Sequence, residues 1–115
     1  MTINANNYAI AMTRGDSESL TVKKKNDMWV SGEVITLTVR TDAEGDIVFQ
    51  KAISEFDENG AAVIPIDPAD TEGADFGTYV YDIQYSNADG TVKTIIPPKP
   101  GKLPKFELTE EATYG

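Results

Sequence analysis

One stretch, from Asp67 to Tyr85, constrains the fold of this chain more than any other. Asp67-Pro68 favours the start of a short helical turn, because aspartate caps helices and proline needs no N–H at the first helical position. Residues 78–85 then alternate as strand side chains do, and they place four large residues on one face: Tyr79, Tyr81, Ile83 and Tyr85. We therefore predict a strand end, one helical turn and a long strand.

Residues 75–79 connect that turn to the long strand. The sequence Asp-Phe-Gly-Thr-Tyr has the spacing of a tyrosine corner, a bend at which a chain passes from one sheet into another. We expect Gly77 to make the bend. The long strand would then enter a second sheet with Tyr79 at its start.

Seven further segments have the alternation or the boundaries of short strands. The clearest is Glu33 to Arg40, where apolar residues alternate with threonines and an arginine. The others cover residues 8–13, 17–24, 47–53, 61–66, 91–96 and 103–109. The side chains that we expect to point inward are Ile35, Leu37, Val39, Ala62, Ile64, Ile66, Phe106 and Leu108, with Trp29 over one end of the core. Pro65 lacks a ladder donor, so its strand is expected at an edge or with the proline facing outward.

Turn signals separate these segments. Residues 42–46 predict a hairpin loop in which Gly45 supplies a positive φ, and Asn59-Gly60 is a strong hairpin signal. Asn87 to Gly90 predicts another hairpin turn. Short strands with a turn every eight to twelve residues are the pattern of a sandwich. We predict an all-β fold, an immunoglobulin-like antiparallel β-sandwich of about seven to eight strands.

The 115 residues suffice for one domain, and we assign residues 1–115 to a single β-sandwich domain. Residues 1–7 are polar and are expected to form a loose N-terminal arm, or one that orders on contact. The Pro-rich segment 97–102 is expected to interrupt strand pairing and to extend as polyproline does. Residues 110–115 are expected to form a tail.

Charge is unevenly distributed along the chain. The net charge is −9, and residues 42–89 contain twelve acidic residues against one basic residue, Lys51. Such an acidic centre repels phosphate backbones, so we expect no nucleic-acid partner. Lys23-Lys24-Lys25 is the one basic cluster. This cluster fits a solvent-exposed strand edge that its lysines keep from aggregating, or a docking patch for an acidic neighbour.

The residue types argue against catalysis. The chain has no histidine and no cysteine, so neither an activated serine or cysteine nor a His/Cys metal site can be built. No phosphate-binding glycine loop precedes a helix. We therefore predict that the protein is not an enzyme, with no catalytic, cofactor-binding or metal-binding residues. Because no apolar run reaches transmembrane length and no secretion signal is visible, we expect no membrane partner.

Two short motifs leave alternatives open. Asp42, Glu44 and Asp46 in one loop, and Asp57, Glu58 and Asn59 in another, offer oxygen ligands for calcium, although acidic residues and asparagine are common in exposed turns anyway. Arg14-Gly15-Asp16 spells the tripeptide that integrins recognise, but here it lies where a glycine turn is needed between two strands. We favour the structural interpretation of both.

Five aromatic residues are candidates for a carbohydrate-binding face. Carbohydrate-binding modules often use stacked aromatic side chains on a flat β surface, and the candidates here are Tyr79, Tyr81 and Tyr85 with Trp29 and Phe49. The competing interpretation is that aromatic residues at every second position of a central strand form the core. We favour the core, and we expect Tyr85 to be the most exposed of them.

Several segments together resemble a known group of proteins. They are residues 13–17, 32–40, 67–71, 77–84 and 89–96. In their residue pattern they resemble the small β-sandwich proteins of phages and prophages of Gram-positive gut bacteria, and they are similar to the N-terminal domain of baseplate upper proteins. The resemblance spans nearly the whole chain. It implies an immunoglobulin-like sandwich that serves in a virion, and it carries over no functional residues.

The function that we expect is therefore structural. The chain would be a non-enzymatic virion structural or assembly protein of a tail, baseplate or fibre, made in the bacterial cytoplasm without a signal peptide. Its partners would be other virion proteins or itself, as a homo-oligomer, with the basic N-terminal third meeting the acidic centre head to tail. The alternative is a carbohydrate-binding or cell-surface adhesion module.

Overall fold

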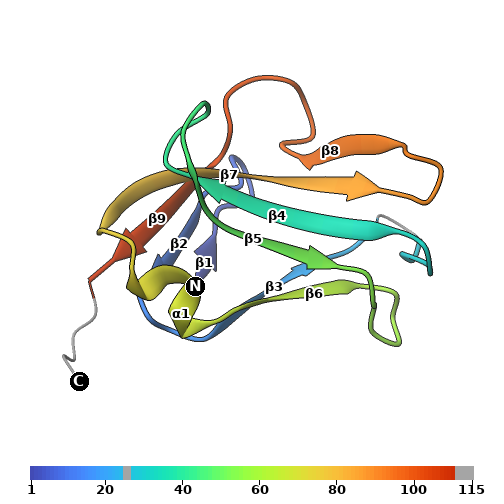
Figure 1. The fold of residues 1–115 in the computed structure, drawn as a ribbon, viewed down its shortest axis with the longest axis horizontal. Helices are drawn as coiled ribbons and strands as arrows, with labels where there is room; N and C mark the ends of the chain where they lie inside the picture. Colours follow the sequence, from blue (N-terminus) through green and yellow to red (C-terminus); the bar gives the residue numbers. More distant parts are fainter. Residues whose placement is uncertain (25–26, 111–115) are drawn as a thin grey trace.

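The computed structural model describes residues 1–24 and 27–110, and these form an all-β fold (Figure 1). The strands are β1 (Thr2–Ile3), β2 (Ile10–Thr13), β3 (Glu18–Val22), β4 (Val34–Arg40), β5 (Ile47–Ile53), β6 (Ala62–Ile66), β7 (Gly77–Ser86), β8 (Val92–Ile96) and β9 (Lys105–Thr109). One short helix, α1 (Pro68–Glu72), joins β6 to β7. No helix within the described residues has the length and apolar character needed to cross a membrane.

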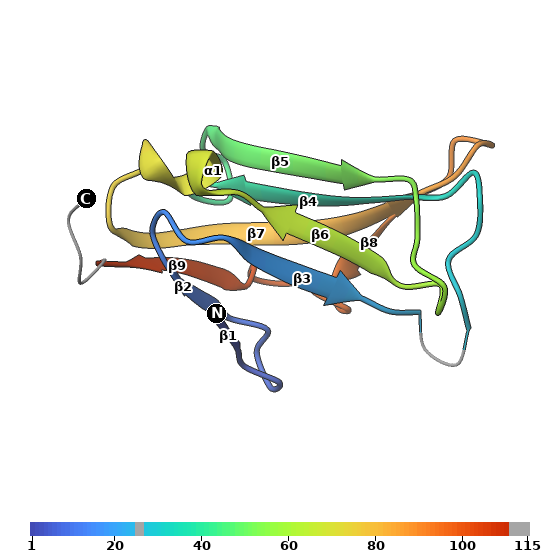
Figure 2. The same cartoon turned by 90° about the horizontal axis from the view of Figure 1, so that it is seen from below.

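The strands form two sheets of unequal width. The larger sheet has the order β1-β2-β9-β7-β4-β5, and β8 also pairs with β7. The smaller sheet contains β3 and β6. The view in Figure 2 shows the two strands of the smaller sheet running side by side next to the larger sheet. Because two strands cannot cover a seven-stranded sheet, part of the larger sheet is left without a facing layer.

Both sheets contribute to one apolar core. The alternation predicted for the β4 segment is confirmed, since Ile35, Leu37 and Val39 are all buried. The inward faces predicted for the β6 and β9 segments are confirmed as well. Pro65 pairs with Ser19 and is exposed, as expected of a proline at the outer face of a strand. The period-two pattern therefore identified the core.

β7 is the longest strand and lies inside the larger sheet. One of its edges pairs with β4 at residues 80–86. Its other edge pairs with two strands in succession, first β9 at residues 77–80 and then β8 at residues 83–86. A strand with pairs on both edges fixes the positions of its neighbours. The stretch from Asp67 to Tyr85, which contains most of β7, therefore organises the larger sheet as predicted.

The predicted helical turn and corner are both present. Asp67 precedes α1 as its N-cap, and its backbone N–H donates to the Asp70 carboxylate at 2.7 Å. The Tyr79 hydroxyl donates to the backbone carbonyl of Asp75 at 2.7 Å, which is the hydrogen bond of a tyrosine corner. Gly77 has a φ of +144°, a conformation that L side chains rarely adopt, so glycine is needed there.

The turn at Asn59-Gly60 corrects one prediction. Gly60 has a positive φ of +72°, but the strands before and after it do not form a hairpin. β5 pairs with β4 in the larger sheet, whereas β6 pairs with β3 in the smaller one. Turn chemistry fixes the local bend, but burial of the apolar faces of β5 and β6 decides the sheet to which each belongs.

Gly45 corrects a second prediction. The loop does connect β4 to β5 as a hairpin, yet Gly45 does not adopt a positive φ. Its role is steric, because a Cβ atom at this position would lie 1.9 Å from the Thr41 hydroxyl oxygen and 2.9 Å from the Asp42 backbone nitrogen. Because position 45 lies so close to Thr41 and Asp42, only glycine fits there.

The N-terminal arm is more ordered than predicted. Thr2–Ile3 pairs with β2, and the N-terminal amino group contacts the Glu18 carboxylate at 2.8 Å. The asparagines make the turn, since the Asn4 side chain accepts the backbone N–H of Asn6 and of Asn7. The described residues thus contain nine strands rather than seven or eight. One pair, β2 with β9, is parallel, because no hairpin joins these two strands and their relative direction is not set by a tight turn.

The Pro-rich segment separates the two strands, β8 and β9, that pair with one edge of β7. Residues 97–102 form consecutive bends rather than a regular extended helix. β8 and β9 therefore follow one another along the same edge of β7, separated by this excursion (Figure 1). The chain rejoins the edge where the Tyr81 N–H donates to the Pro104 carbonyl at 3.0 Å. Of the predicted tail, Glu110 is exposed and residues 111–115 lie outside the described part.

Candidate functional site

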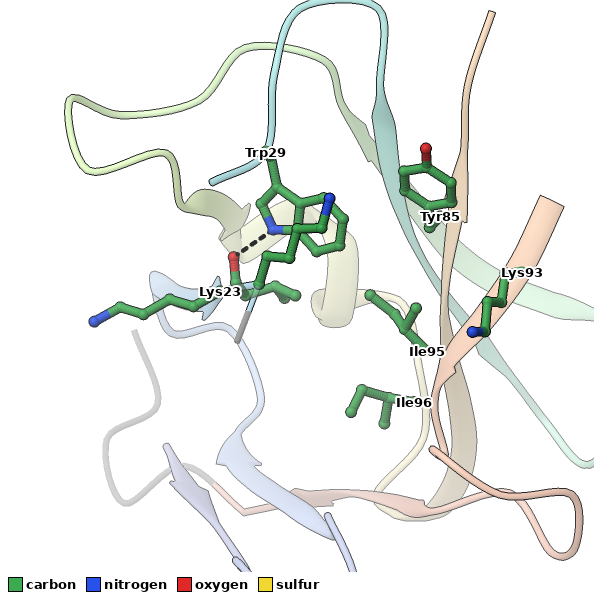
Figure 3. Close-up of a pocket in the computed structure, with 8 residues that line it drawn as sticks. Lys23, Trp29, Tyr85, Lys93, Ile95 and Ile96 are labelled. Carbon is green, nitrogen blue, oxygen red and sulfur yellow. Dashed lines mark hydrogen bonds between the residues drawn. The ribbon is translucent and has the colours of Figure 1, made fainter. Parts of the chain in front are cut away.

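A pocket opens between the end of β3 and the strands β7 and β8 (Figure 3). Its volume is about 460 Å³, which lies within the usual range of ligand pockets, roughly 300–1,000 Å³. We call it the lysine-rimmed pocket, and its lining residues are Val22, Lys23, Lys24, Trp29, Tyr85, Lys93, Ile95 and Ile96. Among the described residues, β3 pairs only with β6 and β8 only with β7. The pocket thus lies between two strands that each have an unpaired edge.

Trp29 is fixed in the wall of this pocket by three contacts. Its indole Nε1 donates to the Val22 carbonyl at 3.1 Å, and its backbone N–H donates to the Gly60 carbonyl at 2.9 Å. Its ring stacks on that of Tyr85, with 5.6 Å between the centroids and 28° between the planes. The aromatic wall is therefore already in place before any ligand arrives.

A β-bulge supplies the apolar floor. Between residues 83 and 84 of β7, the register with β8 advances by two residues, from Ile96 to Thr94. Ile95 is the extra residue, and a bulge of this kind turns a side chain away from strict alternation. Both Ile95 and Ile96 line the pocket as a result. Without the bulge, one of the two would point to the opposite face of the sheet.

Three lysines surround the opening. The Lys24 ammonium lies 5.4 Å from the centre of the Trp29 ring and 3.7 Å from the Asp27 carboxylate. In Figure 3, Lys23 extends outward from the pocket. Within residues 1–24 and 27–110, neither Lys23 nor Lys93 forms an ion pair with an acidic side chain. The pocket therefore presents positive charge beside an apolar surface.

A hydrogen-bond network holds Tyr85 at its outer end. The Tyr85 hydroxyl bonds to the Glu33 carboxylate, and Asn87 Nδ2 donates to the Tyr85 oxygen at 3.1 Å. Glu33 is buried and also accepts the Val30 N–H at 2.8 Å. The bond from Tyr85 is the main cause that lowers the pKa of Glu33 below its ordinary value of 4.5, and the bond from Val30 adds to it. The same bond raises the pKa of Tyr85 above 10.

Replacing Glu33 by glutamine tests this network. Because the pKa of Glu33 is lowered on folding, its carboxylate stabilises the protein above pH 4.5 and loses that contribution as the pH falls through the folded pKa. Since the pocket beside it is open to solvent, we expect Glu33→Gln to lower the free energy of unfolding by only about 1 kcal/mol at pH 7. The difference from the wild type should shrink toward zero at pH 3. Urea denaturation at both pH values measures it.

Glu107→Gln is the matched control for this prediction. Glu107 is exposed on β9, and its replacement removes the same charge away from the pocket. We expect its effect on stability to stay within about 0.5 kcal/mol at pH 7, as for most surface substitutions. An effect of Glu33→Gln that is equal at pH 3 and pH 7 would contradict the role of the ionised carboxylate.

The structure separates the five aromatic residues proposed for a sugar-binding face. Trp29 and Tyr85 line the pocket. Tyr81 and Phe49 are buried in the core, and Tyr79 is half-buried at the corner, where its hydroxyl is already bonded. A single flat face of five aromatics does not form, because the inner side of the larger sheet is covered by the smaller one at Tyr81 and Phe49.

The two short motifs serve the fold. Arg14 packs its guanidinium 4.0 Å from the centre of the Phe76 ring and donates to the Ala74 carbonyl at 3.2 Å. The Gly15 N–H donates to the buried Thr71 hydroxyl at 2.8 Å, and Gly15 has a φ of +85°. The tripeptide therefore attaches the β2–β3 turn to α1, which supports the structural interpretation.

The acidic loops proposed for calcium also have a structural role. The Asp42 carboxylate accepts the Glu44 N–H at 3.0 Å, and the Asp57 carboxylate accepts the backbone N–H of both Asn59 and Ala61 at 2.9 Å. These are the side-chain bonds of ordinary Asx turns. In the described part of the chain, no three acidic side chains gather in a group that could hold a metal ion.

Sequence reasoning missed Lys93, Ile95 and Ile96 as pocket residues. The sequence carried one signal, since adjacent isoleucines at the end of a strand break the alternation. The position of Lys93 opposite Tyr85 follows only from the pairing of β8 with β7, which the sequence does not specify. Of the predicted basic cluster, Lys23 and Lys24 line the pocket, whereas Lys25 lies outside the described residues.

Comparison with known proteins gave no relative: no family model, no curated protein and no solved structure matches the chain.

Proposed function

We propose that this chain is a non-enzymatic interaction and assembly module, which captures a segment of a neighbouring protein in the lysine-rimmed pocket. The observation that carries the proposal is the position of the pocket between two unpaired strand edges. An extended segment can bond to such an edge with its main chain while its side chains enter the adjoining pocket. The apolar floor and the rigid Trp29 ring supply contact area, and the unpaired lysines supply charge.

We further propose that the fold is immunoglobulin-like. Two features support this assignment. The order β9-β7-β4-β5 beside a sheet of β3 and β6 corresponds to the G-F-C-C′ and B-E strands of a variable-type domain, and Tyr79 makes its corner bond at the start of the strand equivalent to F. In this assignment the Pro-rich segment interrupts strand G, and the pocket lies beside β8, the first half of that strand.

The particle in which the module works would be a phage or prophage virion, in a tail, baseplate or fibre. Support for this setting comes from the five sequence segments that resemble small phage sandwich proteins. The test is to induce phage production in the bacterium that encodes the chain and to purify particles on a density gradient. We expect mass spectrometry to find the chain in the particle fraction at a constant ratio to the other virion proteins. Its confinement to the soluble fraction would refute the virion role.

A carbohydrate-binding module is the second candidate, and the stacked pair Trp29 and Tyr85 favours it. Sugar rings pack on aromatic faces, and this pair lines a cavity of about 460 Å³. Because Trp29 is the single tryptophan of the chain, its fluorescence reports directly on this site. Titration with cell-wall polysaccharides would shift the Trp29 emission if the pocket binds sugars, and would leave it unchanged if the pocket binds protein segments only.

A further inference from the structure

We infer that the lysine-rimmed pocket receives the acidic segment Glu110–Tyr114 of a second copy of this chain. The inference rests on the proposed assembly function and names the partner of the same site. It would make the association head to tail, with a pocket on one copy and a segment from the next.

Charge distribution is the first argument. The chain carries a net charge of −9, yet residues 91–105 contain four lysines and no acidic residue. Of these lysines, Lys93 lines the pocket together with Lys23 and Lys24, so the pocket carries three positive charges on a protein of acidic net charge. A basic site on an acidic protein attracts acidic segments of other copies.

The second argument concerns which acidic segment is available. Asp67 and Asp70 of the α1 region already bind Lys51, at 3.1 Å and 2.9 Å. The Asp42 and Asp57 carboxylates of the turns accept bonds from the backbone of their own loops. Glu110 and Glu111 come after the last strand, and the sequence adds an aromatic ring three positions later at Tyr114. Two carboxylates followed by an aromatic side chain complement lysines beside an aromatic wall.

The third argument is where the last strand ends. Figures 1 and 2 show that β9 ends on the side of the molecule where α1 lies, whereas β3 and β7 end toward the opposite side. Val22 at the end of β3 and Tyr85 near the end of β7 line the pocket. Six residues span at most about 20 Å, and the molecule is 44 Å long. We therefore expect so short a segment to meet the pocket of a neighbour rather than that of its own copy. Such a heterologous contact forms rings or open chains of subunits.

The test is sedimentation velocity of the full chain with two complementary variants. The pocket variant is Lys24→Glu/Lys93→Glu, and the tail variant is Glu110→Gln/Glu111→Gln/Tyr114→Ala. We expect the wild type to associate as its concentration rises, more strongly at about 50 mM than at about 500 mM salt, and each variant to associate at least about tenfold more weakly. Lys99→Glu/Lys102→Glu makes the same charge change on the Pro-rich segment and should behave nearly as the wild type does.

Mixing the two variants gives the sharper result. The pocket variant still has a tail and the tail variant still has a pocket, so together they should form a one-to-one pair that does not grow further. Near-UV circular dichroism checks that both remain folded. A peptide of residues 109–115 added to the wild type should shift the Trp29 emission and disperse the assemblies. This experiment uses only the wild-type protein, so its result does not depend on whether the variants fold.

Three outcomes would overturn the inference: a wild type that stays monomeric up to several hundred micromolar, a tail variant that associates as the wild type does, or a peptide that leaves Trp29 unaffected. These failures are separate from failure of the proposed function. A chain found in purified particles but monomeric alone would keep its assembly role with another partner. A chain that self-associates through its tail but is missing from particles would keep the contact and lose the virion setting.

Discussion

Replacing Phe106 by alanine is expected to lower the free energy of unfolding by about 3–5 kcal/mol, the usual cost of removing a fully buried aromatic ring. Phe106 has 0% exposure. Its ring meets the ring of Phe49 edge-on at 5.8 Å and that of Tyr81 at 6.3 Å. Both contacts are lost with the ring, and the residues around the cavity belong to different strands that cannot all move inward.

The position of β9 makes this substitution a test of the architecture as well. β9 lies between β2 and β7 in the larger sheet, so Phe106 supports a parallel pair on one side and an antiparallel pair on the other. A loss of this size is a large part of the roughly 5–15 kcal/mol by which domains are stable. Urea denaturation followed by Trp29 fluorescence measures it.

Phe76→Ala is the control for Phe106→Ala. It removes the same ring from a site that is 38% exposed, where the main loss is the contact with the Arg14 guanidinium. We expect a clearly smaller effect than at Phe106. Equal losses at the two positions would mean that Phe106 does not occupy the centre of the core, and they would contradict the placement of β9 between β2 and β7.

Short-range sequence patterns were sufficient to predict the buried faces of the core strands and the tyrosine corner. Residues of β6 and β9 alternate strictly in burial, and those of β4 do so except at the buried Thr38. Alternation together with burial of one face leaves each strand one register. The tyrosine corner was predictable because its donor and acceptor, Tyr79 and Asp75, are only four residues apart. Interactions of this range are encoded within a single segment, so one sequence was enough to find them.

The sheet membership of β5 and β6 was not predictable in the same way. Asn59-Gly60 correctly marked a turn, but a turn does not state whether its flanking strands pair with each other. Trp29 contributes to the answer from about thirty residues away, since its N–H bonds to the Gly60 carbonyl. Choices that depend on contacts distant in sequence are the ones that local patterns leave open.

The pocket was unpredictable for a related reason. It joins Lys24 and Trp29 to Lys93 and Ile95, which lie far along the chain on another sheet. Its floor also depends on a bulge, and a bulge reverses the inward and outward assignment that alternation gives. Sequence reasoning found the lysine cluster and the two aromatic residues separately. Only the packing of β8 beside β7 shows that they share one site.

Raising the pH from 9 to 11 should destabilise the protein through Tyr81. Its side chain is 3% exposed, and its hydroxyl donates to the Tyr8 carbonyl. Burial raises its pKa from 10.0 to about 12. A pKa that is higher in the folded state contributes stability below pH 10 and loses it as the pH rises toward 12. We expect a loss of about 1.4 kcal/mol by pH 11 and at most about 3 kcal/mol by pH 12.

Tyr81→Phe isolates this contribution from those of Tyr85 and Lys51, whose pKa values are also raised and which act in the same direction. At pH 8 the variant should be less stable by about 1 kcal/mol, because the Tyr8 carbonyl loses its donor. Between pH 9 and 11 its stability should fall less steeply than that of the wild type, so the two curves approach and then cross. Parallel curves would show that the Tyr81 hydroxyl ionises as freely in the folded protein as in the unfolded chain. That result would contradict the burial of this hydroxyl in the core.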